Sequence, residues 1–463
     1  MKLATTEACA VLSASIQGTL PAELALSIDT RTLQTGQTYL ALVGERFDGH
    51  AFLTAAHHAG AAAAIVSNPT ALPPELPGIV VADTHNALLS LAALSRRHFC
   101  GAVIALTGSA GKTTTKAFLA HILEAAQIGP IAATPLNENN EIGVSKVLLG
   151  LTCEAAAVIE MGARQPDDIA PLVSIARPHI AILTNVGDAH VGIFGSRAEL
   201  ARTKWQIFAN GGQPILSLAD AVSRERYTSL SQAPLFCGLA SDPPIADVAT
   251  LRLAGHTLQW HPRNTPSQEA VLTDLPPGEH NQRNLLSACS AALLLGIPLT
   301  TVARAASSVS LPNGRYERIS APGGITIIHD AYNASPSGSV ASLQAFAQEA
   351  GRRIVLFGGM AELGEEAVAA HRRVGAALAP VHAAKILLSG ELAHEVAEGA
   401  RAAGVLAETI VQTPDNATSI ATLQAFVQPG DIILIKGSRR YALEEIVHAL
   451  RPAQAGVPAR QAA

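Results

Sequence analysis

The segment 107–114, which reads Thr-Gly-Ser-Ala-Gly-Lys-Thr-Thr, limits the possible folds more than any other part of the chain. It follows the apolar run 102–106 directly and precedes a stretch, 112–127, whose pattern predicts a helix. A glycine-rich loop between a buried strand and a helix directs backbone N–H groups and the positive end of the helix dipole at an anion. In such a loop the lysine meets the outer phosphates of a nucleotide and the next threonine binds Mg²⁺. We therefore expect a phosphate-binding loop made of Thr107, Gly108, Ser109, Ala110, Gly111, Lys112, Thr113 and Thr114.

This loop has two alternative interpretations. Leu106 stands where the longer form G-x-x-x-x-G-K-T has its first glycine, so the motif is the shorter T-G-x-x-G-K-T. A glycine-rich turn without a ligand shares part of that pattern, but the coincidence of strand, loop, Lys-Thr pair and helix favours a phosphate site. A nicotinamide-binding fold is disfavoured because the chain contains no G-x-G-x-x-G.

Short strand-like runs that are largely apolar on both faces predict a parallel sheet, because strands covered by helices are buried on both faces. Such runs lie at 102–106, 156–159, 179–183, 214–218, 325–329, 353–357, 385–388 and 431–435. We predict an α/β fold with three domains: 1–86, a central P-loop domain at 87–311 with a parallel sheet, and a Rossmann-like domain at 312–463. The alternating, proline-containing segment 238–274 predicts an antiparallel insertion.

Charge and cysteine content exclude several classes of protein. The net charge is −5 and no run of Lys or Arg occurs, so we expect no binding to nucleic acid. Five cysteines without a C-x-x-C argue against a disulfide framework and for a reducing cytoplasm. No window approaches 18 uninterrupted apolar residues, which predicts no membrane span. We expect a cytoplasmic monomer that acts on small molecules.

Polar residues follow several predicted strands, at the edge where ligands bind in parallel α/β sheets. Glu160 ends the run 156–159 and is a natural Mg²⁺ ligand, although a helix N-cap is the alternative. Asn185, Asp188 and His190 follow the run 179–183, and Asp330 follows 325–329. His190 taken alone reads more simply as a structural histidine.

Motifs along nearly the whole chain resemble the Mur ligase family, and they occur in that family's order. They include Asp29-Thr30-Arg31, the P-loop, Asn137-Glu138-Asn139-Asn140, Glu160, His190, Lys204, Asn281 with Asn284, Arg315, and the stretch from Asp330 through Tyr332 and Asn333. The resemblance implies a three-domain ligase that uses ATP to convert a carboxylate into an acyl phosphate, which an amine then attacks.

The resemblance also implies roles for individual residues. Lys112, Lys204, His190 and Arg315 are expected to be catalytic. Two Mg²⁺ ions are expected, the first on Thr113 and Glu160, the second on His190 near a CO₂-derived carbamate on Lys204. ATP contacts are expected from the P-loop, Asn281, Asn284, Arg315 and Asp330. Substrate contacts are expected from Asp29, Thr30, Arg31, Asn137, Asn140, Tyr332 and Asn333.

The third region resembles the branch of the family that adds D-alanyl-D-alanine to UDP-MurNAc-tripeptide during peptidoglycan precursor synthesis. Three stretches carry this likeness, namely 330–337, 360–364 and 436–439. The branch that adds diaminopimelate or lysine carries D-N-P-R, whereas Asp415-Asn416 is followed here by Ala417-Thr418. A folylpolyglutamate synthetase would lack the first region, and a P-loop NTPase acting as a switch would need no amine acceptor. The chain departs from the branch's usual residues at Gly192, Gln206, Ser335 and Gly359.

Overall fold

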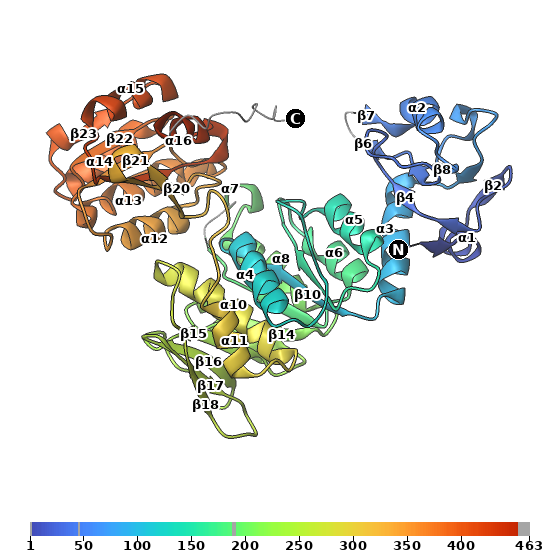
Figure 1. Ribbon diagram of the computed structural model, residues 1–463, viewed down its shortest axis with the longest axis horizontal. Coiled ribbons are helices and arrows are strands. Elements are labelled where there is room, and N and C mark those ends of the chain that lie inside the picture. Colours follow the sequence, from blue (N-terminus) through green and yellow to red (C-terminus); the bar gives the residue numbers. More distant parts are fainter. Residues whose placement is uncertain (1, 45–46, 188–190, 452–463) are drawn as a thin grey trace.

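The computed structural model describes residues 2–44, 47–187 and 191–451. These form three α/β regions, with the first at upper right, the second at the bottom and the third at upper left (Figure 1). The predicted fold class is therefore confirmed. Within the described ranges, no helix has the length and apolar character needed to cross a bilayer.

The first region is a small sheet with strand order β2-β9-β8-β5-β4, in which only β2 is antiparallel to its neighbour. Its central strand β8 is buried along its whole length, as its Ala-Ala-Ile-Val sequence predicts. Two short pairs, β1–β3 and β6–β7, lie beside the sheet. The elements of this region are β1 (Leu3–Ala4), α1 (Thr5–Leu12), β2 (Ser15–Gln17), β3 (Glu23–Leu24), β4 (Leu26–Ser27), β5 (Thr38–Leu40), β6 (Val43–Gly44), β7 (Phe47–Asp48), α2 (Leu53–His58), β8 (Ala63–Val66), β9 (Gly78–Val80) and α3 (Thr84–His98).

The second region holds a nine-stranded sheet of order β11-β12-β10-β13-β14-β15-β16-β17-β18. Its first seven strands are parallel, so their carboxyl ends share one edge. The strands are β10 (Ala102–Thr107), β11 (Ile131–Ala133), β12 (Ala156–Glu160), β13 (Ile180–Leu183), β14 (Gln213–Ser217), β15 (Leu235–Leu239), β16 (Ala249–Ala254), β17 (Thr257–His261) and β18 (Gln268–Val271). The predicted antiparallel segment 238–274 is therefore no separate insertion. It continues the same sheet, with β16 parallel to β15 and only β17 and β18 antiparallel.

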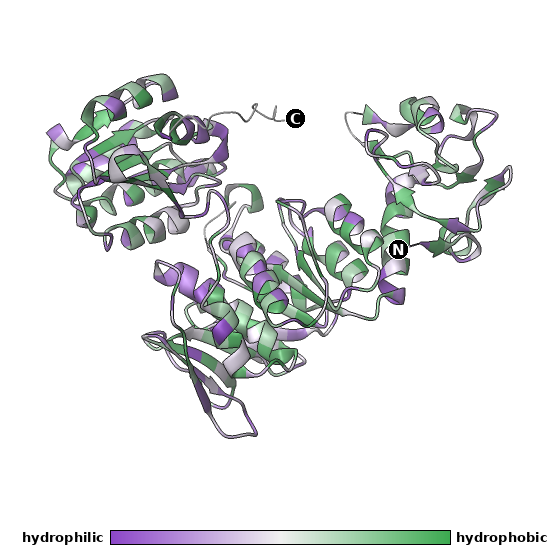
Figure 2. Cartoon of the chain, in the orientation of Figure 1, coloured by the Kyte–Doolittle hydropathy of each residue, from purple (hydrophilic) through white to green (hydrophobic). Residues whose placement is uncertain are grey.

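Helices cover both faces of this sheet, which explains why its strands are apolar on both sides (Figure 2). One face packs against α4 (Lys112–Ala125), α10 (Glu279–Leu294) and α11 (Leu299–Ala306). The other packs against α3, α5 (Glu141–Gly150), α6 (Ile169–Ala176) and α8 (Arg197–Trp205). Two short helices, α7 (Val191–Phe194) and α9 (Ala221–Arg226), follow strands β13 and β14.

The third region is a six-stranded sheet of order β19-β20-β24-β21-β22-β23 with only β19 antiparallel. Its strands are β19 (Glu317–Ala321), β20 (Ile325–Asp330), β21 (Arg353–Phe357), β22 (Lys385–Leu388), β23 (Ile410–Gln412) and β24 (Ile432–Lys436). Its helices are α12 (Pro336–Phe346), α13 (Ala367–Ala376), α14 (Ala393–Ala402), α15 (Asn416–Phe426) and α16 (Glu444–Leu450). The first three helices pack on one face and the last two on the other, as in a doubly wound fold.

Candidate functional site

Two glycines of the predicted phosphate loop approach their neighbours too closely for any side chain. Gly108 has φ +153° and Gly111 has φ +82°. A Cβ atom on Gly108 would lie 1.9 Å from Thr184 Oγ1, and one on Gly111 would lie 2.2 Å from Asn284 Oδ1. The loop between β10 and α4 therefore needs glycine at both positions.

The segment that follows β13 fixes the phosphate loop through hydrogen bonds. Ser109 N donates to Asn185 O at 3.0 Å, and Ala110 N donates to Asn185 Oδ1 at 3.1 Å. Thr184 Oγ1 and Asn185 Nδ2 both donate to Ala110 O, at 2.7 and 3.0 Å. Hydrogen bonds from this edge of the sheet thus fix the phosphate loop without the help of a nucleotide. Asp188 and His190, predicted three and five residues further on, lie outside the described residues.

Two lysines converge on the loop from different helices. Lys112 Nζ donates to Gly108 O at 2.8 Å, and Lys204 Nζ donates to the same oxygen at 3.2 Å. Lys204 is only 1% exposed. Burial, and then the nearby charge of Lys112, hold the pKa of Lys204 far below its usual value. Burial likewise lowers the pKa of Lys112, against the opposing effect of Glu160. The sequence predicted both lysines, and the structure places them side by side.

A third lysine, Lys116, was not predicted. It lies one turn after Lys112 on α4 and is 6% exposed. Its Nζ donates to Thr134 O at 2.7 Å and to Leu136 O at 2.8 Å, and it lies 3.3 Å from Glu160 Oε2. Its spacing of four residues from Lys112 could have indicated this role, because residues four apart lie on the same face of a helix. Lys116 therefore ties α4 to β11 and neutralises the carboxylate at the end of β12.

Glu160 has the properties of a cation ligand. Its Oε1 accepts from Asn139 Nδ2 at 2.9 Å, whereas its Oε2 is buried without a hydrogen bond among the described residues. Burial raises the pKa of Glu160, but Lys112, Lys116 and the bonds from Asn139 and Thr113 outweigh it and leave the pKa below its usual value. An ionised carboxylate oxygen beside a threonine hydroxyl fits Mg²⁺. Among the described residues, no group of three or more His, Cys, Asp or Glu could form a metal site.

The third region reaches the loop through Arg315. Its Nη2 donates to Thr113 Oγ1 at 3.2 Å, and its guanidinium lies 4.2 Å from the centre of the Tyr332 ring. Arg439 lies 5.6 Å from the centre of the same ring. Burial lowers the pKa of Arg315, although nearby carboxylates oppose the shift. An arginine of the third region thus contacts the threonine that follows the P-loop lysine.

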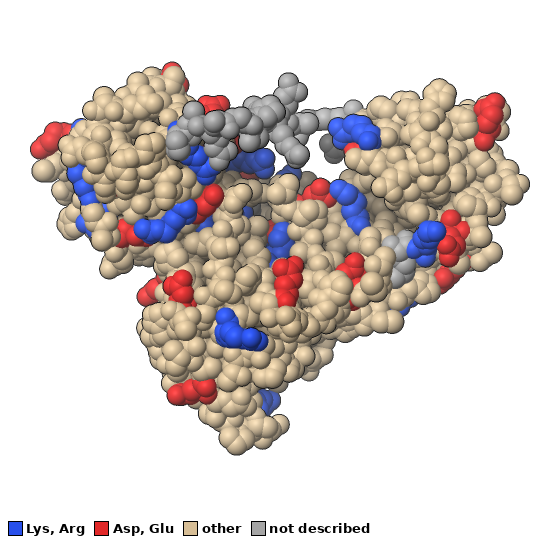
Figure 3. Space-filling view, viewed as in Figure 1, with Lys and Arg blue, Asp and Glu red and all other residues tan. Residues whose placement is uncertain are grey.

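These groups line one cavity of about 510 Å³, here called the phosphate cavity. Its walls come from the second and third regions. They include Ser109, Ala110, Gly111, Lys112, Thr113, Asn137, Asn139, Glu160, Arg164, Arg315, Tyr332, Asn333 and Arg439. Figure 3 shows Lys and Arg side chains around the hollow between the first and third regions. The net charge of −5 is therefore locally reversed where an anion would bind.

A second cavity of about 250 Å³ lies behind the loop, against the first turns of α10. Asn284 lines it together with Gly111, His280 and Asn185. Burial lowers the pKa of His280 to about 4. The cavity adjoins the glycine that begins α4, so it fits the base and sugar of a nucleotide whose phosphates occupy the loop.

Several predicted site residues are engaged within the protein. Asn281 donates to Pro277 O at 2.9 Å, and Asn140 caps α5 by accepting from Gly143 N at 3.0 Å. Asp330 accepts from Tyr316 N at 3.2 Å and lies 3.1 Å from Lys436 Nζ. Thr107 and Thr114 are buried under the loop and do not line the phosphate cavity.

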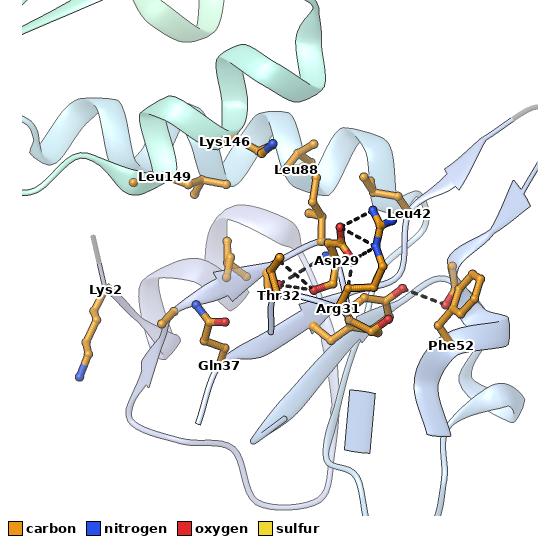
Figure 4. A pocket seen from close by; sticks show the side chains of 18 of the residues that line it. Lys2, Asp29, Arg31, Thr32, Gln37, Leu42, Phe52, Leu88, Lys146 and Leu149 are labelled. Atoms are coloured by element: carbon orange, nitrogen blue, oxygen red, sulfur yellow. Dashed lines mark hydrogen bonds and ion pairs between the residues drawn. The ribbon is translucent and has the colours of Figure 1, made fainter. Parts of the chain in front are cut away.

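A third cavity, of about 1030 Å³, opens in the first region (Figure 4). It is lined by Asp29, Thr30 and Arg31 on one side, and by Lys146 and Leu149 of α5 on the other. The Asp29 carboxylate accepts hydrogen bonds from Arg31, at 2.8 Å from Nη2, and these lower its pKa to about 2. The predicted trio therefore shares one wall, well away from the phosphate loop in Figure 1.

The four departures from the branch's usual residues each have a local cause. Gln206 donates to Asp167 Oδ1, where a glutamate would repel. Ser335 caps α12 by accepting from Gly338 N at 3.3 Å. Gly359 has φ +83°, and its Cβ would lie 3.2 Å from Tyr441 Oη. A Cβ on Gly192 would lie 2.8 Å from Gly364 N of the third region.

Comparisons with known proteins agree with this geometry along the chain. The "Mur ligase family, catalytic domain" matches residues 25–98, the "Mur ligase middle domain" matches 106–292, and the "Mur ligase, glutamate ligase domain" matches 314–439. The UDP-N-acetylmuramoyl-tripeptide–D-alanyl-D-alanine ligase of Escherichia coli is 33% identical over 448 residues, which cover 95% of this chain and 96% of that protein.

Two solved structures share the arrangement of the whole molecule. The UDP-N-acetylmuramoylalanyl-D-glutamyl-2,6-diaminopimelate–D-alanyl-D-alanyl ligase from Acinetobacter baumannii is 29% identical, with a TM-score of 0.82 over 97% of this chain and 98% of that one. The MurF ligase from Thermotoga maritima, in complex with ADP, is 26% identical, with a TM-score of 0.77 over 92% and 97%.

Proposed function

The chain belongs to the Mur ligase family, and we propose that it joins D-alanyl-D-alanine to UDP-MurNAc-tripeptide at the expense of ATP, in peptidoglycan precursor synthesis. Relatives that match along more than nine-tenths of the chain carry that activity in their names. The observation that carries the proposal is the contact between Arg315 of the third region and Thr113 of the P-loop, beside Glu160.

The chemistry begins with a carboxylate, which is a poor electrophile and repels the phosphates of ATP. In the proposed mechanism, Lys112 and the N–H groups at the start of α4 bind the outer phosphates. Arg315 stabilises charge on the γ-phosphoryl group as it moves to the peptide carboxylate. The phosphoryl–oxygen bond to ADP breaks, and an acyl phosphate forms. The amine of D-alanyl-D-alanine then attacks the acyl carbon and displaces inorganic phosphate.

Thr113 and Glu160 would hold Mg²⁺ in this site. The ion would supply charge neutralisation between the phosphates and the incoming carboxylate. Asn139 keeps Glu160 Oε1 in place, so Oε2, which has no hydrogen bond among the described residues and lies 3.3 Å from Lys116 Nζ, would be the ligand atom. His190 is proposed for a second ion on family resemblance alone, since it lies outside the described residues.

Lys204 is proposed to carry a carbamate. Only a neutral amine reacts with CO₂, and burial beside Lys112 favours the neutral form of Lys204. The product is an anion beside the Lys112 cation, and it could help to hold the second Mg²⁺.

The other two cavities are assigned to the ends of the substrates. The cavity with Asn284 is proposed for the adenine and ribose of ATP, and the cavity with Asp29, Thr30 and Arg31 for the uridine end of the UDP-peptide. Asn137, Tyr332 and Asn333 line the phosphate cavity and are proposed to contact the reacting peptide or dipeptide. Asn281, Asn140 and Asp330 are proposed to support the site through their internal bonds.

We propose domain boundaries at 1–86, 87–311 and 312–463, with the first boundary inside α3, which packs on both sheets, because no strand of the described residues pairs across 86 or 311. Closure between the second and third domains would exclude water from the acyl phosphate. None of the five cysteines is in a disulfide, which supports our proposal of a cytoplasmic site of action.

One incubation tests the function: the protein with ATP, UDP-MurNAc-tripeptide and D-alanyl-D-alanine, with products identified by mass. We expect the pentapeptide, and phosphate release that depends on the dipeptide. Product from free diaminopimelate or lysine instead would assign the other branch. That outcome is disfavoured because Asp415-Asn416 is followed by Ala417-Thr418 and not by the Pro-Arg of the other branch. Phosphate release without any acceptor would indicate a simple NTPase.

A further inference from the structure

A fourth cavity, of about 470 Å³, lies between the phosphate cavity and the cavity of the first region, here called the uridine-end cavity. None of the roles proposed above accounts for it. We call it the middle cavity. It shares Asn137, Asn139, Gly162 and Arg164 with the phosphate cavity. On its other side, Glu138 of the middle cavity pairs at 2.6 Å with Lys146, which lines the uridine-end cavity. The middle cavity therefore adjoins the phosphate cavity and, across the Glu138–Lys146 ion pair, the uridine-end cavity of the first region.

The acidic side chains of the middle cavity are already paired. Glu138 bonds to Lys146, and Glu141 lies 2.7 Å from His85 Nε2. The Asp168 carboxylate accepts from the backbone N–H groups of Arg164 and Gln165, at 2.7 and 2.8 Å. The cavity therefore offers no unpaired carboxylate for a cationic ligand among the described residues.

Arg164 also lines the middle cavity, but unlike these carboxylates its side chain is unpaired among the described residues. Its guanidinium has neither an acid nor a hydrogen-bond acceptor among the described residues, and the side chain is exposed into both cavities. The segment that carries it is well anchored. Asp167 Oδ1 lies 2.8 Å from Arg202 Nη2 and also accepts from Gln206 of the segment after α8. The backbone that carries this unpaired cation is thus held in place between the phosphate cavity and the uridine-end cavity.

Resting on the proposed function, we propose that the middle cavity binds the peptide stem of the UDP-linked substrate, and that Arg164 determines specificity by binding a stem carboxylate other than the one that is phosphorylated. A guanidinium binds a carboxylate through two parallel N–H···O bonds. The Acinetobacter relative is named for a stem of alanyl-D-glutamyl-2,6-diaminopimelate. Such a stem offers two carboxylates of this kind, one on the glutamyl residue and one on the diaminopimelate.

The test is a binding measurement by calorimetry, without ATP, on the full chain. The ligands are UDP-MurNAc-tripeptides that end in diaminopimelate or in lysine, and a third in which the glutamyl carboxylate is an amide. The variants are Arg164→Met and Arg164→Lys, with Gln165→Ala as the control in the same segment. Losing a charged, two-pronged bond should weaken the diaminopimelate peptide about tenfold in Arg164→Met and less in Arg164→Lys. The KM values for ATP and for D-alanyl-D-alanine, and the affinity of Gln165→Ala, should stay at wild-type values.

The affinities of wild type and variant for the three peptides identify which stem carboxylate Arg164 binds. If it is the diaminopimelate, wild type discriminates against the lysine peptide and Arg164→Met does not. If it is the glutamyl residue, the amide peptide shows that pattern instead. Equal affinity of wild type and both variants for every peptide would overturn the proposal, as would wild-type indifference to both changes of ligand. If wild type makes no pentapeptide at all, the proposed function fails, whereas ligation with unchanged Arg164 variants removes only this inference.

Discussion

Lys112 and Lys204 direct their Nζ atoms at one acceptor, the carbonyl oxygen of Gly108, at 2.8 and 3.2 Å. The two residues are far apart in sequence, on α4 and α8, and they meet because parallel strands end at a common edge. Two ammonium groups so close together cannot both be easily charged, which favours the neutral form of the more buried one, Lys204.

Carbamylation of Lys204 should be detectable directly. We expect ¹³CO₂ to give a carbamate signal in NMR spectra of the wild type that is missing from Lys204→Ala. Activity of the variant should fall by about 100-fold or more, and acetate should restore part of it by supplying an anion. The matched control is Lys385→Ala, a lysine at the start of β22 that lines none of the cavities described above. A fully active Lys204→Ala enzyme would contradict the prediction.

Lys112→Ala should abolish ligation while leaving the fold intact. The lysine makes one hydrogen bond, to Gly108 O, so its loss has a small effect on stability, whereas the charge that meets the outer phosphates disappears. We expect a loss of activity of at least about 100-fold with little change in Tm. Ligation at a rate close to wild type would remove the P-loop from the mechanism.

Lys116→Met should destabilise the protein and change its response to Mg²⁺. The substitution removes two hydrogen bonds to carbonyl groups and the ion pair with the buried Glu160 carboxylate, a loss of about 3 kcal/mol. A divalent cation can then supply the missing positive charge. Mg²⁺ should therefore raise the Tm of the variant more than that of the wild type, in the absence of ATP. Equal shifts would mean that Glu160 is not a Mg²⁺ ligand.

Arg31→Ala should separate the two nucleotide sites. Arg31 lines only the cavity of the first region, so its removal should weaken the UDP-peptide about tenfold and leave the affinity for ATP unchanged. Calorimetric titration with each ligand measures this. Arg97→Ala, a charge change on α3 away from this cavity, serves as the control. Parallel losses for both ligands would indicate misfolding.

His280 predicts a pH dependence of stability. Its pKa is about 4 in the folded protein, against an ordinary value of 6.5, because burial disfavours the charged ring. Between these values the unfolded chain binds the proton and the folded chain does not, so stability falls as pH falls from 6.5 to 4. The loss reaches roughly 3 kcal/mol across that window. Urea denaturation of His280→Gln should show a smaller loss between pH 7 and pH 5, and an identical slope would contradict the assignment.

Much of the fold could be predicted because buried parallel strands appear in the sequence as short, mostly apolar runs. The ranges of β21 and β22 coincide with the apolar runs 353–357 and 385–388, and the P-loop lies where its motif placed it. The continuation of the central sheet through β16 was missed. Alternation identifies strands but does not say which edge they join, and the parallel pairing of β15 with β16 is a tertiary choice.

The site was less predictable than the fold, because the sequence shows which residues are present but not which residues they contact. Lys116 resembles any lysine on a helix until its bonds to Thr134 O and Leu136 O are seen. Asn140, Asn281 and Asp330 resemble ligand contacts, yet hydrogen bonds and an ion pair within the protein already occupy them. Arg164 gave no signal, since an unpaired cation is recognised only by the absence of acids around it in the described structure.

The strand order of the third sheet has a consequence for how the protein is made. β24 lies between β20 and β21, although it is the last strand in the chain. The first two sheets can complete their pairing while the ribosome is still adding residues, since their last strands end at Val80 and Val271. The third cannot close until Lys436 has emerged. During translation we therefore expect two finished domains to precede a half-sheet whose middle stays open until the final strand is inserted.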